Sequence, residues 1–159
     1  MGHEFLRTFC RTHAHALVVL DREGCGQEAL PREQLESFIE EALARSGWSE
    51  RARAVVIDPE LEAWVWSDSP CVDRELHWEQ RQPDLRAWLR DQGLLGRDAV
   101  KPARPKEALE AALRAVRMPR SSAIYEALAK KVSVQRCEDP AFGKLKAVIQ
   151  GWFAESPSR

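Results

Sequence analysis

The sequence lacks any apolar run that approaches the ~20 residues needed to cross a bilayer. Its amino end, MGHEFLRTFCRTH, lacks the apolar core of a secretion signal. The four cysteines (Cys10, Cys25, Cys71 and Cys137) have no paired spacing of the kind that disulfide frameworks and zinc sites use. Internal repeats and low-complexity segments are also absent. These absences predict a cytoplasmic protein with free thiols and no membrane partner.

The remaining composition is that of an ordinary folded domain, with 44% hydrophobic and 31% charged residues in a chain of 159. A chain of this length buries roughly two-thirds of the surface that its unfolded form exposes, so we expect one domain spanning residues 1–159. The net charge of −1 conceals an asymmetry: residues 1–80 carry 8 Lys/Arg and 16 Asp/Glu, whereas residues 81–159 carry 16 and 9. This split suits carboxylates that gather a cation beside a basic surface that gathers phosphate. It equally suits two halves whose charges intermix on folding.

Hydrophobic spacing predicts a β-α-β core in residues 1–68. A short helix over residues 4–12 precedes HALVVLD, which has the character of a strand buried on both faces. The clearest amphipathic helix opens at Pro31 and closes near Gly47, and ARAVVID, residues 52–58, is a second strand. Because a connection of helix length joins the strands, they should pair in parallel.

The basic second half, residues 81–155, predicts helices over 83–91, 106–116, 121–131 and 140–153. The preceding stretch has no clean period and suits either a loop or an edge strand at Leu76 to Trp78. The fold class is therefore α/β, a small parallel sheet flanked by helices with a helical C-terminal region. A sheet normally needs at least about three strands for independent stability. Either further strands lie in residues 69–101, or a partner completes the sheet, or the chain lacks an N-terminal strand.

Acidic side chains follow both predicted strands. Asp21 and Glu23 follow the first, and Asp58, Glu60 and Glu62 follow the second. Open α/β sheets bind ligands outside the carboxyl ends of their strands, and carboxylates crowded there would repel one another without a cation. Such oxygen-rich sites suit Mg²⁺ or Mn²⁺ and metal-assisted phosphoryl chemistry. The structural alternative is that Asp58 caps a helix, Glu60 lies in its first turn and Asp21 starts a turn.

Basic residues of the second half supply candidates for contact with the phosphates of a nucleic acid. They belong to KPARPK and to a lysine pair, and each also suits an ordinary solvated surface. The candidates are Lys101, Arg104, Lys106, Lys130 and Lys131.

Three motifs together resemble a family of small bacterial proteins related to the Toprim fold. The motifs are LDREGCG, VIDPELEAWVWSD, and the region that runs from KPARPKEAL through SSAIYEALAKKV to CEDPAFGKLKAVI. Members of the family occur in antiphage defence gene clusters, and the likeness is greatest to a component of the methylation-associated defence systems. In Toprim domains an Asp-x-Asp pair followed by glycine ends a strand and helps to bind Mg²⁺ for cleavage or transfer of phosphodiesters.

The resemblance places Asp21-Arg22-Glu23 at this acidic pair, with glutamate for the second aspartate. It also matches the segment from Glu60 to Trp64 with a Glu-x-Glu-Ala-Trp-like segment of the family, with Asp68 shortly beyond it. These matches imply a nuclease-like module that uses Mg²⁺ or Mn²⁺. Its implied metal ligands are Asp21, Glu23, Glu60 and Glu62, and its implied catalytic residues are Asp21, Glu23 and Glu62.

One Toprim element is missing from this pattern. Toprim domains place a glutamate, which serves as general acid or base, at the end of an earlier first strand. Here the chain begins in the following helix, and no strand precedes Glu4. The resemblance therefore implies either a metal-dependent nuclease that acts on nucleic acid or a catalytically inactive subunit that binds another protein of the defence complex. The acidic residues favour the first, and the missing strand favours the second.

Overall fold

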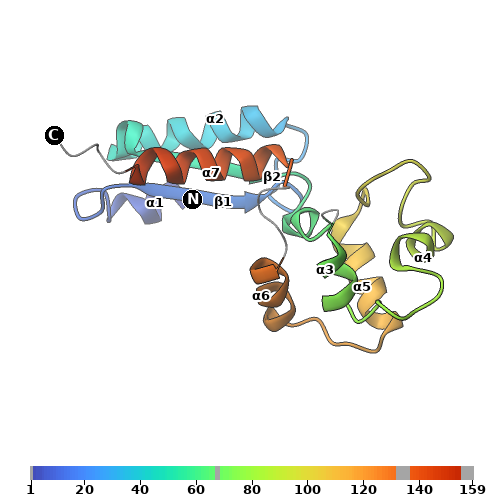
Figure 1. Ribbon diagram of the computed structural model, residues 1–159. Helices are drawn as coiled ribbons and strands as arrows, with labels where there is room; N and C mark the ends of the chain where they lie inside the picture. Colours follow the sequence, from blue (N-terminus) through green and yellow to red (C-terminus); the bar gives the residue numbers. More distant parts are fainter. Residues whose placement is uncertain (1, 67–68, 132–136, 155–159) are drawn as a thin grey trace. The chain divides into compact units, whose positions relative to one another are not determined.

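The computed structural model describes residues 2–66, 69–131 and 137–154. They form two compact units (Figure 1). We call Met1–Asp58 with Asp139–Arg159 the sheet unit, and Pro59–Glu138 the helical unit. Asp68, which the resemblance placed beyond the acidic segment, lies outside the described residues.

The sheet unit contains the predicted β-α-β element. Strands β1 (Ala16–Asp21) and β2 (Ala52–Ile57) pair in parallel, with their first residues opposite each other. Helix α2 (Arg32–Leu43) connects them, followed by a π-helical turn (Ala44–Trp48) and a 3₁₀ turn (Ser49–Arg51). Gly47 has a φ of +97°, a left-handed conformation that ends the helix where the sequence predicted. The α/β class and the parallel pairing are confirmed.

Two further helices complete this unit. Helix α1 (Gly2–Arg7) is shorter than predicted, because the chain continues in turns before β1. Helix α7 (Pro140–Phe153) returns to pack against β2, and Figure 1 shows α2 and α7 running alongside the strands. Trp48 is buried and its Nε1 donates a 3.1 Å hydrogen bond to the carbonyl of Leu6. The core of this unit therefore links α1 to the end of α2.

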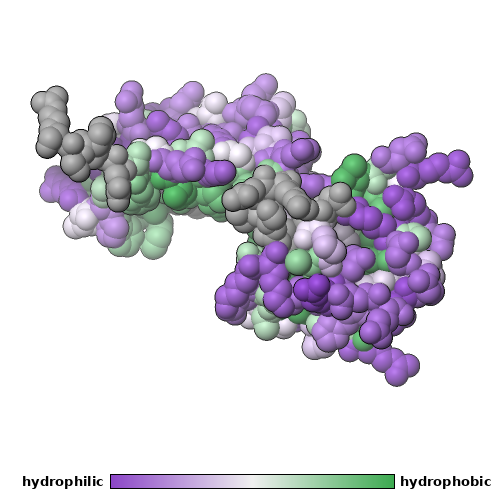
Figure 2. Space-filling view, viewed as in Figure 1, coloured by the Kyte–Doolittle hydropathy of each residue, from purple (hydrophilic) through white to green (hydrophobic). Residues whose placement is uncertain are grey.

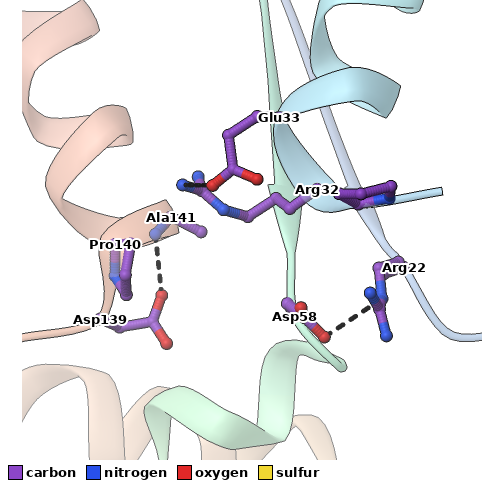
Figure 3. Close-up of a pocket in the computed structure, with 8 residues that line it drawn as sticks. Arg22, Arg32, Glu33, Asp58, Asp139, Pro140 and Ala141 are labelled. Carbon is purple, nitrogen blue, oxygen red and sulfur yellow. Dashed lines mark hydrogen bonds and ion pairs between the residues drawn. The ribbon is translucent and has the colours of Figure 1, made fainter.

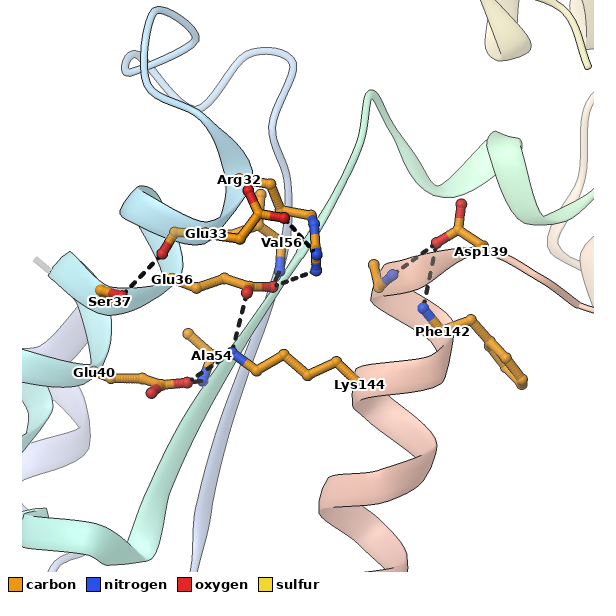
Figure 4. A network of polar contacts seen from close by, with 11 residues as sticks. Arg32, Glu33, Glu36, Ser37, Glu40, Ala54, Val56, Asp139, Phe142 and Lys144 are labelled. Carbon is orange, nitrogen blue, oxygen red and sulfur yellow. Dashed lines mark hydrogen bonds and ion pairs between the residues drawn. The ribbon is translucent and has the colours of Figure 1, made fainter.

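Side chains close the outer edge of β2. The amide of Ala54 donates to Glu40 Oε1 at 2.9 Å, and the amide of Val56 donates to Glu36 Oε1 at 3.0 Å. Lys144 Nζ from α7 bonds both carboxylates, at 3.1 Å to Glu36 Oε2 and 2.9 Å to Glu40 Oε1 (Figure 4). Two glutamates of α2 thus occupy the positions at which a third strand would pair.

The outer edge of β1 differs from that of β2, because no described side chain bonds the outward-facing backbone groups of Leu17 and Val19. The amide of Arg22 donates to the carbonyl of Ile57 at 2.8 Å, so the backbone groups of Arg22 face β2. Because successive residues of a strand alternate in direction, the backbone groups of Leu17 and Val19 face the opposite edge. No strand among residues 2–66, 69–131 and 137–154 pairs with that edge. The side chain of Val19 is 45% exposed.

The helical unit contains helices and turns, and no strand in its described part. A 3₁₀ turn (Leu61–Trp64) is followed by α3 (Pro70–Glu75), α4 (Leu85–Asp91), α5 (Pro105–Ala115) and α6 (Ser122–Lys131). All four helices contribute to one apolar core. None of the described helices of either unit combines the length and the apolar character that a membrane span requires.

The helix predictions for the second half are confirmed within about two residues at each end. The predicted alternative of an edge strand at Leu76 to Trp78 is wrong. These residues follow α3 in a turn, where His77 has a φ of 55° and the amide of Trp78 donates to the carbonyl of Asp73 at 2.7 Å. The alternative that residues 69–101 contain further strands is also wrong, because this stretch folds into helices and turns.

Candidate functional site

A pocket of about 370 Å³ lies at the carboxyl end of the sheet (Figure 3). This is the end at which open α/β sheets bind their ligands. Arg22 and Asp58 follow directly after the two strands, and the starts of α2 and α7 form the other walls. The whole pocket belongs to the sheet unit. Its lining consists of Arg22, Pro31, Arg32, Glu33, Asp58, Asp139, Pro140 and Ala141.

The charged groups of this pocket pair with one another. Arg22 Nε lies 3.2 Å from Asp58 Oδ1, and Arg32 Nη2 lies 2.7 Å from Glu33 Oε1. The carboxylate of Asp139 accepts a 3.0 Å hydrogen bond from the amide of Ala141 and so caps α7. The side chains of Arg22 and Asp58 remain 32% and 41% exposed, which keeps their ion pair accessible to solvent and weak.

Two of the predicted metal ligands lie at this end of the sheet. Asp21 is the last residue of β1 and is half-buried, and Glu23 follows on an exposed turn. The register places Asp21 opposite Ile57, directly before Asp58. The structure thus brings Asp21 and Asp58 to neighbouring strand ends, as the sequence predicted. Within the described chain, no group of three or more His, Cys, Asp and Glu side chains has an arrangement that could hold a metal ion.

Glu62 belongs to the helical unit, where its carboxylate is buried and bonded by other side chains of that unit. It is 3% exposed, and its Oε1 accepts hydrogen bonds from Arg120 Nη2 and Tyr125 Oη, both at 2.7 Å. Burial of the phenol, with its hydrogen bond to Glu62, raises the pKa of Tyr125 to about 12. The Glu62 carboxylate therefore ties the 3₁₀ turn that follows β2 to α6 and to the segment before it.

Glu60 also bonds within the helical unit. It is 7% exposed, and its Oε1 accepts a 2.7 Å hydrogen bond from the amide of Lys106 in the first turn of α5. A carboxylate there satisfies an amide without an intrahelical partner and interacts favourably with the helix dipole. The sequence indicated that Glu60 is a metal ligand or, alternatively, a residue in the first turn of its own helix, whereas in the structure its carboxylate bonds the start of a helix 46 residues away.

The five predicted phosphate-binding residues lie in the helical unit, in the segment around the start of α5 and at the end of α6. Ion pairs join Arg104 to Glu107, Lys130 to Glu126 and Lys131 to Glu75. Lys106 is exposed, and Lys101 is partly buried before α5. A surface ion pair contributes roughly 0–1 kcal/mol to the stability of the folded state, so these side chains can exchange their carboxylate partners for phosphate at little cost. Their role in binding nucleic acid stays a prediction.

Sequence reasoning missed the carboxylates that close β2. Glu36 is 4% exposed in a helix whose buried face also carries Leu35 and Leu43. Glu36 and Glu40 are four residues apart, which places both side chains on one face of the helix. This spacing was the signal in the sequence that the two glutamates act together. The partners of these groups lie on distant segments that the spacing does not identify.

Comparison with known proteins leaves the Toprim-like resemblance as a prediction that rests on the quoted motifs. No protein-family model, no curated protein and no solved structure matches the chain.

Proposed function

We propose that the chain is a protein-binding subunit of a bacterial antiphage defence system and that it accepts a β-strand of a partner protein at the outer edge of β1. The contrast between the two edges of the sheet carries this proposal. Glu36 and Glu40 close the edge of β2, while the edge of β1 has no comparable cover among the described residues. The defence setting comes from the family resemblance, and the mode of binding comes from the edge.

An open strand edge presents a row of backbone donors and acceptors that another strand can pair with. On β1 these groups belong to Leu17 and Val19, and no hydrogen bond within the described chain reaches their outward sides. Strand addition at such an edge derives affinity from main-chain hydrogen bonds. It would also extend the sheet to three strands, in line with the alternative, raised from the sequence, that a partner completes it.

The composition of β1 also favours pairing. Proteins protect exposed edges with charged residues, prolines or bulges, and residues 16–20, ALVVL, contain neither a charge nor a proline. Exposed apolar side chains lie on β1, on the helices of the same unit and in the turns that follow α1, and Figure 2 shows hydrophobic surface over β1 and α7. These side chains are Phe5, Phe9, Val19, Phe38, Ile149 and Phe153.

The test uses Val19→Lys, which places a charge in the centre of the edge. We expect this change to weaken binding of the partner at least about tenfold, since a charge must then be buried at the strand interface. The exposed position of Val19 predicts an unchanged melting temperature. The chain is co-expressed with each protein encoded beside it, and the affinity of the purified pair is measured. Phe38→Lys, at an exposed position on α2, is the matched control.

Hydrogen exchange locates the contact in that complex. The amides of Leu17 and Val19 should exchange rapidly in the isolated chain and become protected in the complex. A complex that leaves these amides unprotected, or that tolerates Val19→Lys, contradicts the proposal. A homodimer formed through β1, or the absence of a complex with any neighbouring product, contradicts it as well.

A second candidate function is processing of phosphodiesters with Mg²⁺ or Mn²⁺. The observation that favours it is the position of Asp21 and Asp58 at neighbouring strand ends, beside the 370 Å³ pocket. Glu60 and Glu62 belong to the helical unit, where Lys106, Arg120 and Tyr125 already bond their carboxylates. The candidate therefore rests on Asp21, Glu23 and Asp58.

Titration with metal tests this candidate. If these acids hold Mg²⁺, saturating metal should raise the melting temperature, because a ligand at about 100 times its Kd stabilises the folded state by about 2.7 kcal/mol. Asp21→Asn should abolish the rise, whereas Asp98→Asn, an exposed change in the helical unit, should retain it. Cleavage of single- and double-stranded DNA and RNA is assayed in parallel. No thermal shift at millimolar Mg²⁺ or Mn²⁺, together with no cleavage, eliminates this function.

A further inference from the structure

Arginines dominate a second pocket of the sheet unit, which has a volume of about 790 Å³. The pocket lies near the amino ends of the strands, away from the pocket beside Asp58. Arg7 comes from α1, Arg11 from the turns that follow, Arg45 from the π-helical turn and Arg51 from the residue before β2. Against these four guanidinium groups, the described lining contains one carboxylate, that of Glu4.

Arg51 is a fixed positive charge in this pocket. Its guanidinium donates to the carbonyls of Cys10 and His13, each at 2.9 Å, and to that of Ala14 at 3.2 Å. The same group lies 5.2 Å from the ring centroid of buried Trp48. These neutral partners hold the side chain without cancelling its charge, and arginine stays protonated in proteins.

The other guanidinium groups are available to a ligand. In the part of the chain that the structure describes, the side chains of Arg7 and Arg11 form neither a hydrogen bond nor an ion pair. Arg45 has a loose contact of 3.7 Å with Glu41, and the two side chains are 67% and 69% exposed. Like charges that line one concave surface produce a positive potential that attracts anions.

We propose that this arginine pocket binds phosphate groups, carried by a nucleotide or by the backbone of a nucleic acid strand. The planar fork of arginine bonds two phosphate oxygens at once, which suits three accessible guanidinium groups around one fixed charge. The volume falls within the roughly 300–1,000 Å³ typical of small-ligand sites. The proposal requires neither the β1 edge nor the acids at the carboxyl end of the sheet.

Aromatic rings on the same segment favour a ligand with a base. The rings of Phe5 and Phe9, and those of Phe9 and His13, have centroids 5.4 Å apart. Phe5 is 68% exposed, so its ring is open to stacking. Basic side chains interspersed with exposed aromatic rings are the combination with which proteins hold nucleotides and single strands.

Calorimetric titration of the full chain tests the proposal with three probes: inorganic pyrophosphate, ATP and a short single-stranded DNA. The variant Arg7→Ala/Arg11→Ala should bind the preferred probe at least about tenfold more weakly, since it loses two charge-assisted contacts. Arg97→Ala/Arg114→Ala removes the same charge from exposed positions in the helical unit and should leave the affinity unchanged. Raising the salt concentration should weaken binding of each probe.

The three probes distinguish the sources of phosphate. Equal affinity for pyrophosphate and ATP identifies a site for phosphate alone, tighter binding of ATP identifies a nucleotide, and tighter binding of DNA identifies a strand. Each of these results supports the proposal only if the variant Arg7→Ala/Arg11→Ala binds the preferred probe more weakly than the wild type does. No saturable binding of any probe at millimolar concentration overturns the proposal, as does binding that this variant leaves intact. Val19→Lys and Asp21→Asn should not alter the affinity, so failure here is separable from failure of the functions proposed above.

Discussion

Replacing Glu62 by alanine is expected to lower the free energy of unfolding of the helical unit by about 3 kcal/mol, because Arg120 and the half-buried Tyr125 both lose the buried carboxylate that accepts their hydrogen bonds. Glu62 is 3% exposed and accepts hydrogen bonds from both Arg120 and Tyr125. Hydrogen exchange in α5 and α6 measures the loss within this unit. Glu110→Ala is the matched control, because Glu110 pairs with the same arginine from a site 36% exposed.

The control should cost less than about 1 kcal/mol, as expected for a pair near the surface. If Glu62→Ala costs no more than Glu110→Ala, the structural role of Glu62 is wrong. The result also separates two roles for this residue. A carboxylate required mainly for metal chemistry would leave the stability of the metal-free protein nearly unchanged when removed.

Tyr125 supplies a second measurement of the same contact. It is the single tyrosine of the chain, so the ultraviolet absorbance change on phenol ionisation reports this residue alone. Burial and the hydrogen bond to Glu62 raise its pKa from 10.0 to about 12. Since the folded-state pKa is raised, the associated stability is complete below pH 10.0 and is lost as the pH rises toward about 12. Glu62→Gln should lower the midpoint, and an unchanged midpoint contradicts the contact.

Replacing Glu36 by alanine is expected to destabilise the sheet unit by about 3 to 4 kcal/mol, the lower part of the roughly 3–5 kcal/mol range for breaking a buried ion pair from one side, because Lys144 is 29% exposed. The change leaves the amide of Val56 without its acceptor and removes a carboxylate from Arg32 and Lys144. Denaturant unfolding followed by hydrogen exchange in β2 measures the effect. Glu33→Ala is the control, because Glu33 also pairs with Arg32 but its side chain is 69% exposed.

A conservative variant separates the two parts of the Glu36 effect. Glu36→Gln retains an acceptor for the amide of Val56 but loses the charge that faces Lys144, so it should fall between the wild type and Glu36→Ala. If Glu36→Ala and Glu33→Ala have equal stability, the side chain of Glu36 does not close this edge. The edge contrast that supports strand addition at β1 would then lose its basis.

Local patterns predicted the helices and the strand pair well. Pro31 and Gly47 bracket α2 with its turn, and Asp84 and Asp139 cap α4 and α7 through their side chains. These signals act over a few residues, so no tertiary information is needed to interpret them. The parallel pairing followed because a connection as long as α2 cannot form a hairpin.

The environment of each carboxylate was not predictable in this way. Glu60 and Glu62 follow a strand end, where acids commonly gather a cation, but their partners lie 46 to 63 residues further along the chain. Lys144, which bonds Glu36, lies 108 residues beyond it. A buried charge requires a partner, and the folded chain selects that partner from all segments that reach it.

The sequence by itself determined an α/β chain with two parallel strands, acids after each strand and a basic helical second half, because these features depend on short-range periodicity and composition. Only the tertiary structure decided that Glu36 and Glu40 close one edge of the sheet, that Glu60 and Glu62 bond within the helical unit, and that four arginines share a pocket. Such assignments depend on contacts between segments far apart in the chain, which local spacing does not record.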